Sequence, residues 1–150
     1  MKILLIVVAA IIYANFLEWF VHKYLLHRVA HHPDTKIFTD HFKVHHLMVN
    51  VHKGKDPDYQ RVKFNSEVQG LMGLAFLHLP TLWIHPVFYA TLVVHAITYY
   101  LVHRQCHTDP SWGWKWFPWH MEHHRGREAN WCVLFPLADY VFGTRYKYRK

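Results

Sequence analysis

The sequence predicts an all-α integral membrane protein with about three spans and a histidine-rich helical cap on the cytoplasmic side. Of its 150 residues, 52% are hydrophobic and only 18% are charged, against roughly one quarter charged in soluble domains. Residues 68–102 contain no Lys, Arg, Asp or Glu. Sixteen histidines are present, and most of them fall in short clusters. These three observations predict long apolar helices that carry a metal-binding end.

The first predicted span covers residues 3–26, which is long enough to cross the ~30 Å hydrocarbon core of a bilayer. A cleaved signal peptide is the alternative, with a weak cleavage site at residues 13–15. The apolar character continues through residues 16–17 and 19–21, and this favours a retained helix.

The second apolar region is too long for one simple span, and Pro80 and Pro86 interrupt it. We expect a helical hairpin with arms at about 68–80 and 87–106. Such short arms are tolerated where they pack on the first helix. One long kinked helix is the alternative.

The distribution of Lys and Arg predicts the orientation. Residues 28–63 hold seven of them, residues 104–150 hold eight and residues 80–86 hold none. By the positive-inside rule, the first loop and the C-terminal region are cytoplasmic. We therefore expect one domain over residues 1–150, in a bacterial inner membrane or the endoplasmic reticulum. The uncharged stretch argues against a nucleic-acid partner despite the net charge of +7.

A tryptophan-rich segment follows the second arm of the hairpin, at residues 112–119. Tryptophan prefers the headgroup level of a bilayer, so we expect this segment along the membrane interface. An aromatic core cluster is the alternative.

Ten histidines form four clusters at or near the predicted cytoplasmic face. Imidazole nitrogen is a good ligand for iron, zinc, copper and nickel, and histidines four apart share one helical face. Ten exceed the four ligands of tetrahedral zinc, so we predict two metal ions of higher coordination number. The clusters are His22 and His27; His41, His45 and His46; His103 and His107; and His120, His123 and His124.

The first cluster has an unusual spacing. His22 and His27 are five residues apart, about 140° around a regular α-helix, so they share a site only if the helix ends or bulges there. His27 and His31 have the cleaner spacing of four, which leaves His31 as an alternative ligand to His22 or His41.

The other histidines have simpler interpretations. We expect His78 and His85 to be hydrogen-bonded core residues and His52 to be solvated. His95 lies two helical turns before His103 and can line the site.

Carboxylates near the clusters are expected to accept the second N–H of the ligand histidines. Glu18 lies one turn before His22, and Asp109 and Glu122 flank the later clusters. Asn130 is a fourth candidate for this role.

The clusters occur in an order that resembles a known family. The segments are 19–27 (WFVHKYLLH), 41–46 (HFKVHH), 103–107 (HRQCH) and 120–124 (HMEHH). They are similar to the histidine boxes of the fatty acid hydroxylase/sterol desaturase superfamily. Residues 130–144 resemble its closing segment, with FPL and FGT in order. The resemblance extends over about residues 15–146.

The resemblance implies a membrane-bound non-haem di-iron enzyme. Such enzymes use O2 and two electrons to hydroxylate a lipid C–H bond, fatty acyl or sterol-like. The ten clustered histidines would hold two iron ions, for which zinc can substitute in a purified sample. Electrons would come from a separate carrier of the cytochrome b5, ferredoxin or reductase type. Two departures are the three residues between His41 and His45, where two are usual, and the short chain.

The lipid is expected to enter from the bilayer between the spans. Desaturation and carotenoid hydroxylation use the same di-iron chemistry and are alternatives. A non-catalytic metal- or haem-binding membrane protein is an alternative of another class, although transport would need ionisable clusters on both sides of the bilayer. The predicted walls of the substrate site are Phe16, Phe20, His95, Tyr99 and Trp119.

Overall fold

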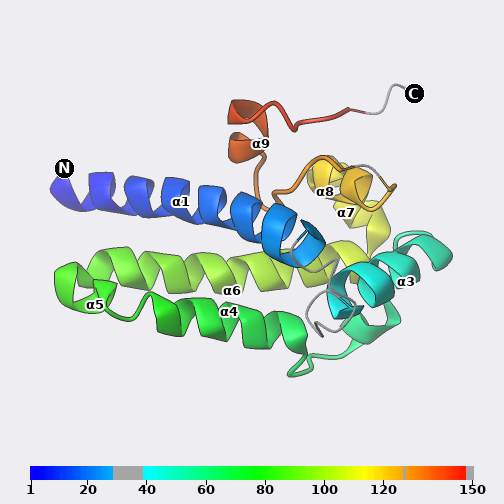
Figure 1. The fold of residues 1–150 in the computed structure, drawn as a ribbon, viewed down its shortest axis with the longest axis horizontal. Helices are drawn as coiled ribbons and strands as arrows, with labels where there is room; N and C mark the ends of the chain where they lie inside the picture. Colours follow the sequence, from blue (N-terminus) through cyan, green and yellow to red (C-terminus); the bar gives the residue numbers. More distant parts are fainter. Residues whose placement is uncertain (29–38, 127, 148–150) are drawn as a thin grey trace.

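The computed structural model describes residues 1–28, 39–126 and 128–147, and all the regular structure in these ranges is helical. Helix α1 (Lys2–Phe20) continues directly into the π-helix η1 (Val21–Arg28). Helix α6 (Pro86–Thr108) lies between α1 and α4 (Ser66–Leu77) (Figure 1). The all-α class is therefore confirmed.

The predicted hairpin is present, and the single kinked helix is wrong. The side chain of Asn65 caps α4 by accepting a hydrogen bond from the amide of Val68 at 3.0 Å. A short helix, α5 (Thr81–Ile84), forms the tip, and His85 is extended before Pro86 begins α6. Proline is favoured there because its fixed φ suits the first turn and it needs no amide partner.

Two helices are long and apolar enough to cross a membrane. They are the continuous helix Lys2–Arg28 and helix α6. The 12 residues of α4 extend over only ~18 Å, less than the ~30 Å of a bilayer core, so a third full span is not confirmed.

The remaining helices gather at the end of the molecule where η1 and the C-terminal end of α6 meet, and α9 lies beside α1 (Figure 1). In the tryptophan-rich segment, Trp114 and Trp116 are 36% and 55% exposed, so they do not form a core. The buried aromatic cluster instead contains Trp19 and Trp131. The helices at this end are η3 (Thr39–His45), α3 (His46–Val51), η4 (Pro57–Gln60), α7 (Pro110–Trp116) and α8 (Pro118–His123), and the helix beside α1 is α9 (Leu137–Val141).

Asn15 joins the first helix to the C-terminal segment. Its side chain is fully buried, donates to the carbonyl of Phe135 at 2.7 Å and accepts from the amide of Ala138 at 2.9 Å. Asp139 stabilises the C-terminal segment itself, because its carboxylate accepts hydrogen bonds from the amides of Trp131 and Cys132. The C-terminal half of α1 is thus part of the folded body.

We predict that Asn15→Ala destabilises the fold. The substitution leaves a buried carbonyl and a buried amide without their partner, which costs roughly 1–3 kcal/mol of unfolding free energy. Thermal unfolding and limited proteolysis of the C-terminal segment, both in detergent, measure the effect. Asn50→Ala, at an exposed side chain, is the control. Equal stability of the two variants would contradict the prediction.

Candidate metal centre

Nine of the ten clustered histidines form two groups in which one ligand atom from each residue lies within 4.8 Å of every other. The tenth, His120, adjoins the second group, with its Nε2 atom 2.9 Å from that of His107 and 3.3 Å from that of His124. The first group is His22, His27, His41, His46 and His123, and the second is His45, His103, His107 and His124.

Two π-helices explain the first group. Hydrogen bonds in a π-helix run from i to i+5, so residues five apart come close to one face. In η1 this brings the rings of His22 and His27 to 5.2 Å between centroids, so of the two possibilities, a helix end or a bulge, the structure has the bulge. The π-helix η3 leads into His46, five residues after His41, and these rings are 5.1 Å apart. His31 lies outside the described residues.

The regular helix α6 supplies two members of the second group, His124 directly follows α8, and His45 ends the π-helix η3. His103 and His107 are four apart on α6, with ring centroids separated by 5.0 Å. At the end of α8 the adjacent His123 and His124 contribute to different groups. The two groups are therefore neighbours.

Four pairs of Nε2 atoms approach each other closely: His22 with His41 at 3.0 Å, His46 with His123 at 3.2 Å, and His120 with His107 at 2.9 Å and with His124 at 3.3 Å. Two imidazole nitrogens bound ~2.1 Å from one metal ion at a right angle are about 3.0 Å apart. The observed separations thus fit adjacent ligands of a coordination shell.

Backbone carbonyls orient three of these rings. A carbonyl only accepts hydrogen bonds, so each Nδ1 must carry the proton, and Nε2 keeps its lone pair for a metal. The Nδ1 donors and their acceptors are His22 with Trp131 at 2.6 Å, His107 with Gly54 at 2.9 Å and His123 with Ala129 at 2.8 Å.

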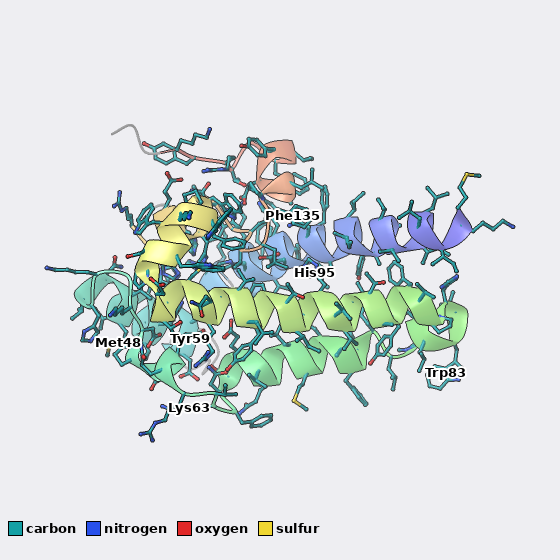
Figure 2. The ribbon with its side chains drawn as sticks, turned by 180° about the vertical axis from the view of Figure 1, so that it is seen from behind. Met48, Tyr59, Lys63, Trp83, His95 and Phe135 are labelled. Atoms are coloured by element: carbon teal, nitrogen blue, oxygen red, sulfur yellow. The ribbon has the colours of Figure 1, made fainter. Side chains whose placement is uncertain are left out.

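Carboxylates orient two rings of the second group. His45 Nδ1 lies 2.6 Å from Asp56, and His103 Nδ1 lies 2.5 Å from Glu67. Tyr59, which Figure 2 shows at the histidine-rich end of α6, donates its hydroxyl to Glu67 at 2.7 Å. Within the described ranges, the buried Nε2 atoms of His45 and His103 have no hydrogen-bond partner. The lone pairs of these two nitrogens can therefore coordinate a metal cation.

Burial keeps these imidazoles neutral. It lowers the pKa of His123 from 6.5 to about 4. For His41, His45, His46 and His124, burial first and the neighbouring histidines second hold the pKa well below 6.5. Neutral imidazole is the form that binds metal.

A cavity of about 900 Å³ lies among α1, α4 and α6 and reaches both groups, through His22 and His41 of the first and His45 of the second. Two of the five predicted wall residues, His95 and Tyr99, line it. The other three lie elsewhere: Phe16 packs on Phe142, Phe20 packs on Tyr24, and Trp119 donates to the carbonyl of Val133.

His78 is hydrogen-bonded, as predicted, but it is half-buried and lines the cavity instead of a core, and the same prediction is wrong for His85, whose buried Nδ1 makes no hydrogen bond among the described residues. The Nδ1 atom of His78 donates to the carbonyl of Leu74 at 2.8 Å, and its Nε2 accepts from the hydroxyl of Tyr13 at 2.7 Å.

The predicted carboxylate partners make other contacts. Glu18 accepts from the amide of Val133 and turns its second oxygen toward His95. Asp109 caps α7 by accepting from the amides of Ser111 and Trp112. Glu122 pairs with Arg145 at 3.0 Å. Asn130 is hydrogen-bonded to both Glu122 and Arg145, so the two predicted residues stabilise the C-terminal segment. The roles expected of these residues fall instead to Asp56 and Glu67. Neither lies beside a cluster in the sequence, so cluster spacing did not find them.

A scan against protein-family models, a search of curated proteins and a search of solved structures each found no match. The function of this centre is therefore argued from its geometry.

We predict that Asp56→Ala lowers metal affinity roughly 10–100-fold, because His45 loses the acceptor that orients it. Competition with a chelator of known affinity measures the change. Asp58→Ala is the matched control, since the Asp58 side chain is 65% exposed and pairs with Lys63. Equal affinities in the two variants would show that Asp56 does not support the site.

We predict that acid destabilises the metal-free protein. Above pH 6.5 these histidines are neutral in both the folded and the unfolded states. Below pH 6.5 the histidines of the unfolded chain become protonated, whereas folded His123 stays neutral down to about pH 4. The free energy of unfolding therefore falls by about 1.4 kcal/mol per pH unit for each such histidine. Unfolding temperatures between pH 7.5 and 5, measured with a chelator present, test this. A shallower slope is expected for His123→Gln, and a wild-type profile without slope would refute the prediction.

Proposed function

We propose that the protein is a membrane-bound non-haem di-iron oxygenase that hydroxylates a C–H bond of a fatty acyl or sterol-like lipid. Its co-substrates would be O2 and two electrons from an external carrier. One observation carries the proposal: ten histidines form two adjacent sets at the end of a cavity that reaches both sets.

The donor set fits iron. Imidazole binds iron, zinc, copper and nickel, but the five histidines of the first group exceed tetrahedral zinc, and His120 beside the second group would add a fifth ligand to its four. When bound, two irons would supply the activation of O2 and the oxidation of the C–H bond. Asp56 and Glu67 would offset part of their positive charge.

The protein residues would position the substrate and exclude water. Apolar side chains of the three long helices, such as Leu17, Leu74 and Leu92, line the cavity together with polar ones near the histidines. A lipid chain placed there would present a carbon beside His22, His41 and His45. Desaturation of a lipid and carotenoid hydroxylation need the same arrangement and remain alternative reactions.

The membrane topology is part of the proposal. Two helices have the length and composition of spans, and α4 would enter the bilayer as a short arm against α6. The Lys and Arg distribution then favours a cytoplasmic histidine end, where an electron carrier would dock.

A non-catalytic metal carrier is the second candidate. A transporter needs ligands along a path across the membrane. Among the described residues, both histidine groups lie at one end of the long helices. This favours a fixed catalytic centre over a transport path.

We expect about two irons per chain and no Soret band in protein purified in detergent after growth with iron. Metal analysis and the visible spectrum measure this. His124→Ala removes a ligand of the second group and is expected to lose about one iron, whereas His52→Ala, at an exposed side chain, is the control. Lipids of the expressing host should gain an oxygen only with the wild-type chain. One metal or none in a folded sample, or a haem band, would refute the proposal.

A further inference from the structure

We propose that Glu18 and His95 form a polar subsite inside the cavity, which binds a hydroxyl group of the substrate. The inference rests on the proposed function, because the occupant is taken to be the lipid that is oxidised. It makes that lipid one that carries an oxygen within its membrane-buried part.

The two side chains face each other across the cavity wall. Glu18 comes from α1 and His95 from α6, on the side that faces α1 in Figure 2. Both line the cavity, and their side chains are 7% and 10% exposed. Glu18 Oε2 and His95 Nε2 are 3.8 Å apart, which is too long for a hydrogen bond. One hydroxyl group beside them can donate its proton to Glu18 Oε2 and accept from His95 Nε2–H.

Each of these atoms lacks a partner within the part of the chain that the structure describes. Glu18 uses its other oxygen, Oε1, to accept from the amide of Val133, and this bond holds the carboxylate in place. Oε2 and His95 Nε2 are buried without a hydrogen bond. Burying a polar atom without a hydrogen bond costs free energy. The pair is therefore suited to bind a polar atom of a ligand.

The surroundings favour a lipid over bulk water as the source of that atom. Leu17, Val21, Leu92 and Ala96 line the same cavity around the pair. A pure hydrocarbon would leave both polar atoms unpaired, while an oxygenated lipid satisfies them and buries its chain against the apolar walls.

The position of the pair limits where the oxygen lies on the substrate. Glu18 is four residues before His22, or ~6 Å along the helix, and His95 is eight residues before His103, or ~12 Å. The bound oxygen is therefore one to two helical turns from the histidine groups. A substrate that spans this distance has several carbon atoms between its oxygen and the carbon that reacts.

The experiment compares two probes of equal chain length, 1-decanol and n-decane, binding to the full-length protein in detergent. Affinities are measured by displacement of a fluorescent fatty-acid analogue and corrected for partition into protein-free micelles. The wild type is expected to prefer the alcohol by about tenfold, the effect of one good hydrogen bond to a buried group. His95→Leu should bring the ratio close to one. His85→Leu is the matched control, because His85 lies at the tip of the hairpin and does not line this cavity.

Glu18→Gln provides a second variant if His95→Leu does not fold, since glutamine can still accept from Val133. It should also lower the alcohol preference. A wild-type ratio near one, or a ratio unchanged in both variants, would overturn the subsite. Metal content is measured on the same samples. Two irons without a preference for the alcohol would support the oxygenase and refute the subsite. A preference for the alcohol in a chain that binds no metal would support the subsite and refute the oxygenase.

Discussion

The arrangement depends on placing ten imidazoles side by side in a buried layer. Their nitrogen lone pairs approach within 2.9–3.3 Å, where neutral imidazoles gain little from one another unless one of each pair donates a proton. Three of the rings already use their Nδ1 proton on a backbone carbonyl, so their Nε2 atoms are acceptors. In each of the three pairs that these rings form with His41, His46 and His120, the acceptor needs either a proton on the partner ring or a cation bound by both nitrogens. The helices are arranged to build that layer.

The π-helices follow from this requirement. A regular helix would place His22 and His27 on different faces, and the i to i+5 hydrogen bonding of η1 removes the difference. From the spacing of five, the sequence predicted only that a shared site needs the helix to end or to bulge there. The same geometry accounts for His41, whose extra residue before His45 looked like a departure from the family pattern. Its place is with His46, five residues on, and not with His45.

Much of the fold and the ligand set could be predicted from the sequence, because both depend on local patterns. Apolar length predicted α1 and the hairpin, Pro80 and Pro86 predicted its tip, and short histidine spacings predicted which histidines come together, but not how they divide into two groups.

The groups that orient the ligands could not be predicted in the same way. The acceptor of His22 is the carbonyl of Trp131, 109 residues away, and a carbonyl has no residue signature. Proximity in sequence was misleading for Asp109. That residue precedes Pro110 and Ser111, a combination typical of a helix N-cap, and it caps α7.

The two histidine groups are not equivalent. In the first, the identified acceptors of Nδ1 are the neutral carbonyls of Trp131 and Ala129. In the second, Asp56 and Glu67 are carboxylates, and a carboxylate makes the imidazole that it accepts from a stronger donor to metal. A cation in the second group would be held more tightly and would be more electron-rich, while the first would leave its cation more electrophilic. The cavity reaches His22 and His41 of the first group but only His45 of the second. The position that would be more electrophilic is therefore the one that more cavity-lining histidines reach, and the position with carboxylate partners contributes only His45 to the cavity.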